Sequence, residues 1–244
     1  MSAGRHLDFL LQEWPYDPDE AVVRLVKGRD GRDLLQMRVD LGVLQMETSG
    51  RPDGARPEGY PTLLDWLSQR EVEDPDFEFD DDLCYEIERE FMQFYHRRMA
   101  WLRLQRYEQA MRDADHTLAL MDLCRDHSPC EEWTMQHEQH RALVLFQRAQ
   151  AAALHAIEQS LPQVAIREID DALLRIAENY ADMGWESEYE SDELVDRLKH
   201  LRETIRNDFQ IGKTLEDQLA EAVAREQYEL AAKLRDEMAR RENA

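Results

Sequence analysis

Histidine and cysteine residues crowd one short part of the sequence. They are His116, Cys124, His127, Cys130, His137 and His140. Zn²⁺ binds cysteine thiolates and histidine nitrogens, usually four at a time in structural sites. Here the ligand types are present, but steps of three residues do not match the usual paired Cys-x-x-Cys knuckles. Two interpretations stay open, a metal site and a loop between helices with a polar histidine face. We expect the second and name no metal ligand.

Other patterns that could carry chemistry are incomplete. Asp113-x-x-His116 is a single match to a motif that carboxylate-bridged metal centres need on two helices. The glycine-bearing stretch from Gly50 to Gly59 lacks the lysine of a phosphate-binding loop. No Gly-x-Ser-x-Gly turn for a nucleophilic serine stands out. The sequence therefore predicts no catalytic residue, no cofactor and no enzymatic activity.

The composition is strongly acidic. The chain has 244 residues and a formal net charge of -23. Nucleic-acid binding depends on neutralising phosphates with lysine and arginine, and the nearest basic groups here are short or interleaved with acids. They are Arg97, Arg98, Arg103 and Arg106, and the pair Arg240 and Arg241. We expect no direct contact with nucleic acid.

Cellular location is predicted from three further features. No apolar run approaches the roughly 20 residues of a membrane-spanning helix. The first residues lack the charged-then-apolar order of a signal peptide. Cys84, Cys124 and Cys130 are too few and too irregularly spaced for a disulfide framework. These features favour the reducing cytoplasm, without a membrane partner.

The first part of the chain has the signals of a small β element. Val22–Val26 is β-branched, Gly28–Gly31 predicts a turn, and Leu35, Met37, Val39 and Leu41 then alternate with polar residues. A third strand is expected at Val43–Met46, followed by a loop over residues 49–61. Thr62 can cap a short helix, Leu63–Leu67. The acidic stretch Glu71–Asp82 is interpreted as a strap that tucks Phe77 and Phe79 onto the body.

Helical spacing begins at Leu83 and continues to the last residues. Turns or breaks are predicted at Gln105–Arg106, Cys124–Cys130 and Gly184–Asp192. Helices are expected at Glu138–Glu158, from Pro162, and around Leu194–Ile205. The predicted fold class is mostly α (α+β). The predicted division is an N-terminal region 1–82, a helical domain 83–183, an acidic loop with a connecting helix 184–211, and a C-terminal hairpin 212–244.

The middle of the chain resembles a tetratricopeptide repeat. The resemblance rests on Leu104-x-x-Tyr107-Glu108-x-Ala110-x-x-Asp113-Ala114. Residues 145–176 are similar to a looser second copy, in which Ala165, Ala172 and Leu173 take corresponding places and the turn at Gln159–Gln163 is longer. Two repeats are fewer than a free-standing solenoid needs. We therefore expect this core to lean on the N-terminal part.

The last stretch predicts a helical hairpin. Leu215, Leu219, Ala222 and Val223 share one helix face, and Tyr228, Ala231, Leu234, Arg235 and Met238 share the facing one. A turn is expected at Glu226–Gln227, and small residues at Ala231 and Ala232 allow close approach. This pattern strongly resembles the UVR (UvrB/UvrC) motif. The whole chain also resembles uncharacterised bacterial proteins described by that motif.

The UVR resemblance implies a protein partner. Such hairpins pair with other UVR hairpins, in the same or another chain, and occur in regulators of protein kinases and of chaperone–protease systems. The resemblance predicts a non-enzymatic adaptor or regulator, with a homodimer as one form. The expected partner-binding residues are Leu215, Leu219, Val223, Arg225, Tyr228, Glu229, Ala231, Leu234, Arg235 and Met238. Open alternatives are a hairpin packed on its own domain, a DNA-repair accessory recruited through the same hairpin, and a metal-binding helical protein.

Overall fold

The protein is described by a computed structural model over residues 7–20, 22–212, 218–219, 222–223, 225 and 227–242. Across these residues it is mostly helical with one small antiparallel sheet, which confirms the predicted fold class. The elements are α1 Asp8–Glu13, β1 Val23–Lys27, β2 Asp33–Val39, β3 Gly42–Glu47, η1 Pro57–Gly59, α2 Leu63–Glu73, α3 Asp81–Arg103, α4 Tyr107–His127, α5 Glu131–Glu138, α6 Arg141–Glu158, α7 Pro162–Asp182, α8 Glu186–Tyr189, α9 Glu193–Asp208 and α11 Tyr228–Glu242.

The three strands form a meander in the order β1-β2-β3, as the alternation predicted. The register pairs Leu35 of β2 with Leu25 on one side and Met46 on the other. Leu41 does not continue β2, because the chain turns between Val39 and Gly42, and its side chain is 88% exposed. Arg38 is buried against expectation, since its Nε donates to the carbonyl of Trp14, 2.8 Å away. Both faces of β2 are therefore partly covered.

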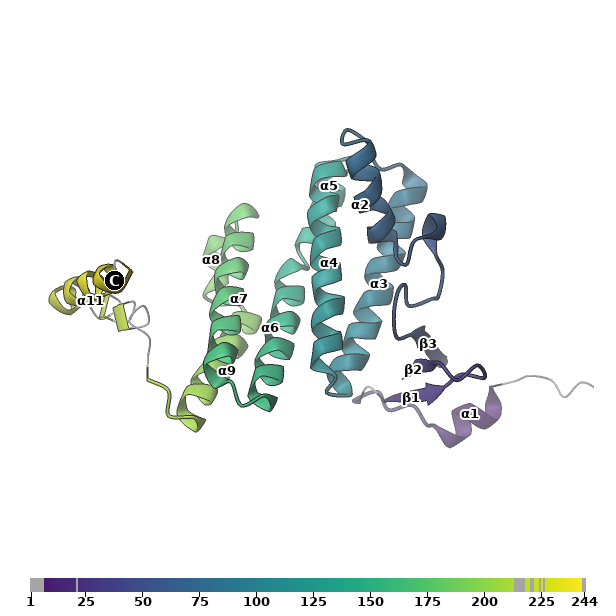
Figure 1. The fold of residues 1–244 in the computed structure, drawn as a ribbon, viewed down its shortest axis with the longest axis horizontal. Helices are drawn as coiled ribbons and strands as arrows, with labels where there is room; N and C mark the ends of the chain where they lie inside the picture. Colours follow the sequence, from purple (N-terminus) through teal and green to yellow (C-terminus); the bar gives the residue numbers. More distant parts are fainter. Residues whose placement is uncertain are drawn as a thin grey trace, which may run out of the picture.

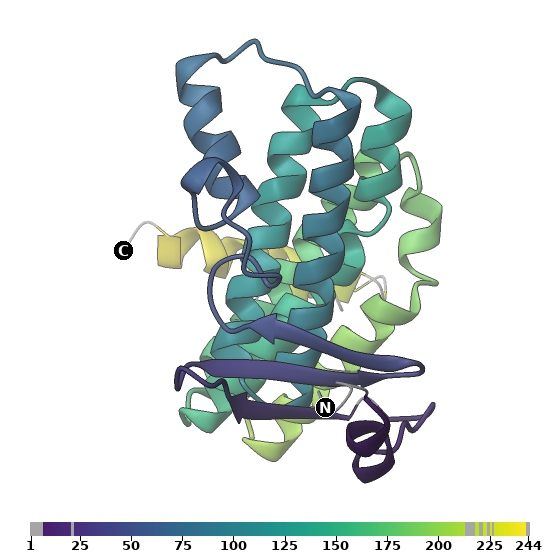
Figure 2. The ribbon, with the colours of Figure 1, turned by 90° about the vertical axis from the view of Figure 1, so that its right-hand side faces the viewer.

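One face of the sheet packs on the α3–α4 end of the helical layer. Leu35, Met37 and Met46 share a core cluster with Ala100 and Trp101 of α3. Figure 2 shows the strands running across the helices at this end. The sheet therefore closes one end of the helical part, as expected if a two-repeat core leans on its N-terminal region.

The helices α3, α4, α6 and α7 stand side by side in one layer (Figure 1), and α9 packs against both α6 and α7. Buried alanines of α6, among them Ala149 and Ala153, let its neighbours α4 and α7 approach closely. Val195 and Leu198 of α9 are fully buried in the same core. The helix predicted as a connector is thus part of the packed layer. None of the described helices is long and apolar enough to cross a membrane.

Two inter-helix turns share one backbone shape. Gln105 and Ser160 have left-handed φ values of 55° and 59°. The amide of Arg106 donates to the carbonyl of Trp101 at 2.9 Å, and Leu161 donates to Ala156 at 2.8 Å, the bonds of a Schellman cap. The second turn ends at Leu161, so the prediction that it is longer than the first is wrong. The paired hairpins α3–α4 and α6–α7 are compatible with the predicted tetratricopeptide-like core.

Two helix boundaries differ from prediction. The break expected from Cys124 lies later, because α4 continues to His127 and Ser128 leaves the helical conformation before Pro129. The helix expected over Glu138–Glu158 begins three residues later, as α6, and a separate short helix that was not predicted, α5, precedes it. The side chain of Glu138, the last residue of α5, accepts hydrogen bonds from Arg141, the first residue of α6, at 2.5 and 2.7 Å.

The acidic strap holds its aromatic residues as predicted. Phe77 and Phe79 are each 4% exposed. The amide of Phe79 donates to the carbonyl of His127 at 3.2 Å, and the His127 ring stacks on Phe77 with centroids 4.1 Å apart. Thr62 caps α2 by accepting a hydrogen bond from the amide of Asp65 at 3.1 Å. These contacts attach α2 and the strap to the end of α4.

Candidate docking hairpin

The C-terminal hairpin is described at both ends of its turn. Residues 218–219 and 222–223 are helical, and α11 begins at Tyr228. The amide of Gln227 donates to the carbonyl of Ala222 at 2.7 Å, which closes the turn. Ala222 is 1% exposed. Glu229 lies in the first turn of α11, where a carboxylate favours the positive end of the helix dipole. The predicted turn at Glu226–Gln227 thus lies between the helical residues 222–223 and the start of α11 at Tyr228.

Large apolar side chains of the hairpin face solvent. Val223 is 52% exposed, Tyr228 68% and Leu230 45%, while Leu219 is half-buried. Burying such a side chain fully is worth about 1.5–3 kcal/mol relative to full exposure. These half-exposed apolar residues on a small hairpin therefore leave stabilisation that a further surface could supply.

Charged residues accompany this apolar set. Arg225, Glu229 and Arg235 are exposed. Nη2 of Arg235 lies 3.0 Å from Oδ1 of Asp236, its neighbour on the same helix. Exposed ion pairs of this kind contribute little to stability, so both side chains can be rearranged at low cost when another surface approaches.

The predicted partner-binding residues are placed unequally. Leu215 lies outside the described residues, and so do the side chains of Ala231, Leu234 and Met238. Tyr228 and Arg235 were assigned to the face between the two helices, but the structure leaves both exposed. For Tyr228 the reason is that it opens α11 directly after the turn.

Leu230 was not among the predicted residues. It stands four positions before Leu234, the spacing that places two residues on the same helix face. That spacing could have identified it from the sequence.

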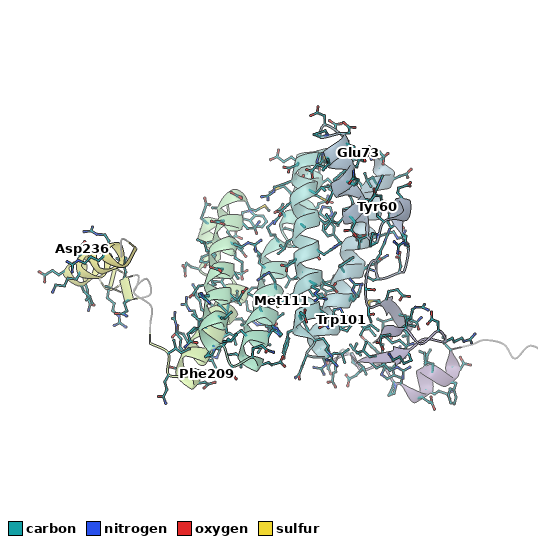
Figure 3. All side chains as sticks on the ribbon, in the orientation of Figure 1. Tyr60, Glu73, Trp101, Met111, Phe209 and Asp236 are labelled. Carbon is teal, nitrogen blue, oxygen red and sulfur yellow. The ribbon has the colours of Figure 1, made fainter. Side chains whose placement is uncertain are left out.

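The hairpin helix stands apart from the helical layer. In Figure 1, α11 lies beyond α7 and α8, at the opposite side from the sheet. Figure 3 shows Asp236 on this helix far from Trp101 near the sheet, with Phe209, which follows α9, between them. The hairpin is thus displayed outside the core that the other helices share.

Comparison with known families decides what this hairpin is. The sequence model described as UVR, UvrB/uvrC motif, matches residues 213–243. The chain carries a UVR motif. No curated protein and no solved structure is found to match the chain.

The UVR motif is a protein-interaction module, and its match confirms the resemblance seen in the sequence. The match covers the hairpin only, so the helical layer and the sheet have no family assignment from it. The tetratricopeptide-like reading of the middle stays a prediction.

The histidine and cysteine cluster of the sequence is dispersed in space. Among the described residues, no group of three or more His, Cys, Asp or Glu side chains is placed to hold a metal ion. His116 stacks on Phe94 at a centroid distance of 3.6 Å, and its Nε2 bonds with Oε1 of the buried Glu90 at 2.9 Å. These partners give His116 a structural role between α3 and α4.

Other cysteine and histidine residues of that sequence cluster lie in environments that differ from one another. Cys124 is buried while Cys130 is exposed, and burial raises the pKa of the Cys124 thiol well above its usual range. His137 packs against Trp133 and Phe91. Burial lowers the pKa of His137, which keeps its ring neutral. Cys124 and His137 are thus packed side chains, and Cys130 lies apart from them at the surface.

Two of the basic residues weighed above for nucleic-acid contact, Arg97 and Arg98, are internal, whereas Arg103, Arg106 and Arg240 are exposed. Arg97 and Arg98 are 4% and 2% exposed. Arg97 forms a double ion pair with Asp113, with N–O distances of 2.9 and 2.7 Å. Arg98 donates to Thr117 and Gln147 at 2.9 and 2.7 Å. Neither forms part of a surface patch that could follow a phosphate backbone.

Proposed function

We propose that this protein is a non-enzymatic adaptor or regulator that docks a partner protein through its UVR hairpin. The observation that carries the proposal is the UVR motif at residues 213–243 with apolar side chains exposed on it. Val223, Tyr228 and Leu230 each expose apolar atoms outside the main core. Exposed apolar patches rimmed by polar residues are typical of protein-binding sites.

The docking mechanism we propose is burial of this apolar surface against a partner helix. Half-exposed side chains such as Val223 and Leu230 would each contribute roughly 1 kcal/mol on full burial. The charged groups of Arg225, Glu229 and Arg235 would lie at the rim. Rim charges set register and association rate more than affinity. The apolar residues thus supply binding energy and the charges supply orientation.

A second UVR hairpin is one partner that this surface suits. In that case two copies of the chain would form a homodimer through α11 and the preceding helical turn. Sedimentation velocity over a range of protein concentrations measures this directly. Partners from the native cell are identified in parallel by affinity purification with mass spectrometry.

The test uses a double variant, Val223→Asp with Leu230→Asp, beside a matched control. The control, Val72→Asp with Leu174→Asp, makes the same changes at residues that are 77% and 61% exposed outside the UVR motif. We expect the hairpin variant to lose self-association or its captured proteins, while the control retains them. If both variants keep the same association state and the same captured proteins as the unchanged chain, docking through this hairpin is wrong.

The identity of the captured proteins separates two roles of the same hairpin. A kinase, protease or chaperone would support a regulator of protein activity or turnover. A repair nuclease or helicase would instead support an accessory role in excision-type DNA repair. In either role we propose that the protein acts in the cytoplasm, because Cys84, Cys124 and Cys130 are too few and too irregularly spaced for a disulfide framework.

A further inference from the structure

A pocket opens on the helical layer where α3 and α4 meet the start of α6. Its volume is about 480 Å³, within the range of small-molecule sites. Its walls are mostly apolar, with Phe91 and Met92 from α3, Met121 from α4, and Leu143 and Val144 from α6. A pocket of this size and lining suits a small ligand with an apolar body.

One charged side chain of the layer also lines this pocket. Arg98 is 2% exposed. Its Nε and Nη1 donate to the neutral side chains of Gln147 and Thr117, at 2.7 and 2.9 Å. Within the described part of the chain, no acceptor lies within hydrogen-bond distance of Nη2 of Arg98. This nitrogen is not fully buried and keeps some contact with solvent. One nitrogen of the guanidinium, Nη2, is therefore left without an acceptor on a residue that lines the pocket.

Arg98 also lacks an ion-pair partner of its own among the described residues. Both carboxylate oxygens of the nearby Asp113 accept hydrogen bonds from Arg97, one from Nε and one from Nη2. Burial lowers the pKa of Arg98 to about 10, so the group stays charged at neutral pH. Asp113 opposes this shift through space but makes its direct contacts with Arg97, so a bound anion in contact with Arg98 would offset more of the cost of burying its charge. The charge and the apolar walls together specify an amphiphilic anion.

We propose that the pocket between α3, α4 and α6 binds a small amphiphilic anion, with its charged head on Arg98 and its apolar body along Phe91, Met121 and Val144. A carboxylate can accept from the free Nη2 of Arg98 while Nε and Nη1 keep their present partners. The acid at the mouth, Glu88, is exposed and accepts a hydrogen bond from Nε1 of Trp133 at 3.3 Å. Its charge is solvated and lies on the rim.

The first experiment compares decanoate with decan-1-ol on the full chain by isothermal titration calorimetry. Both probes have the same alkyl chain, and only decanoate carries a charge. Charge-assisted hydrogen bonds contribute enough to predict a dissociation constant at least about tenfold lower for decanoate. Equal affinity for the two probes would overturn the proposal. So would the absence of decanoate binding up to about 1 mM, the weak end of specific small-molecule affinity.

The second experiment moves a charge to the mouth of the pocket. Met92 is 54% exposed and lines the pocket, and Leu41 is 88% exposed in the β2–β3 turn. We expect Met92→Glu to weaken decanoate binding by about tenfold or more through repulsion and lost apolar contact. The same change in Leu41→Glu should leave it unaltered. Equal decanoate affinity in both variants would contradict the site.

A third variant isolates the charged head. Arg98→Gln keeps a polar side chain toward Thr117 and Gln147 but removes the cation. We expect its affinity for decanoate to fall to that for decan-1-ol, with the latter unchanged. If decanoate still binds Arg98→Gln as tightly as it binds the unchanged chain, Arg98 does not hold the head. Circular dichroism verifies folding, and the probe comparison on the unchanged chain decides the matter if this variant unfolds.

Discussion

The ion pair between Arg97 and Asp113 joins the helical layer to the end of the sheet. Both residues are 4% exposed, and their two N–O contacts are 2.9 and 2.7 Å. The third nitrogen, Nη1 of Arg97, donates to the carbonyls of Glu47 and Gly50 at 3.1 and 2.7 Å. Replacing Asp113 with alanine removes the carboxylate and leaves this buried guanidinium without a counter-charge.

The expected loss of stability is large. Breaking a buried ion pair by removing one partner costs about 3–5 kcal/mol. Arg98 raises that figure, because burial lowers its pKa to about 10 and Asp113 is the acid that opposes this shift. Asp113→Ala thus removes the carboxylate that acts on both buried cations. We expect about 5 kcal/mol, which for a chain of this size lowers the melting temperature by roughly 10–20 °C.

Urea and thermal unfolding followed by circular dichroism measure this change. Asp126→Ala, at an exposed position of the same helix, is the matched control and should shift stability by less than about 0.5 kcal/mol. The double variant Arg97→Met with Asp113→Leu should recover much of the loss, because both charges are gone together. If Asp113→Ala and Asp126→Ala unfold within about 1 kcal/mol of each other, the reasoning from burial is wrong.

Three further predictions concern thiols, pH and a turn. Under native conditions a thiol-specific reagent should label the exposed Cys130, while the buried Cys124, whose pKa burial raises, reacts only on unfolding; mass spectrometry of the labelled peptides checks this. Because burial lowers the pKa of His137 below its unfolded value of 6.5, the unfolded state binds the extra proton, so stability should fall as pH drops below about 6.5. Urea unfolding at pH 7 and pH 5 should show a smaller loss in His137→Gln than in the exposed control His200→Gln. Ser160→Gly should raise the unfolding free energy by about 0.5–1 kcal/mol, because it relieves a left-handed φ of 59° at an exposed position; no gain in urea unfolding would contradict this.

Elements set by local patterns could be predicted from the sequence. Alternation and the Gly28–Gly31 turn give the sheet, and helical spacing gives α3, α4, α7 and α9. Pro162 marks the start of α7, because proline suits the first turn of a helix. The UVR motif was also recognisable, since its ordered positions lie in one short stretch.

Features that depend on distant partners could not be predicted. Two adjacent arginines, Arg97 and Arg98, look like part of a basic surface patch in the sequence. In the structure both are buried, where Arg97 pairs with Asp113 and Arg98 donates hydrogen bonds to Thr117 and Gln147. The split of α5 from α6 follows from local packing around the Glu138 and Arg141 pair, which helical periodicity does not show. Arg98 was therefore missed as a candidate binding residue, because the sequence does not show that it is buried without a directly paired carboxylate.

The dependence of the N-terminal region on α3 and α4 has a consequence for synthesis on the ribosome. The sheet is translated first, but Leu35 and Met46 are covered only when Trp101 and Ala110 have emerged. In the folded protein the amides of Leu63 and Leu64 donate hydrogen bonds to the carboxylate of Glu90 at 2.9 and 3.1 Å. These bonds likewise form only after Glu90 has been translated. Strand edges and apolar faces that stay uncovered during translation are prone to aggregation. This chain thus passes through an exposed stage for several seconds, at roughly 5–20 residues translated per second, and a nascent-chain chaperone would protect it there.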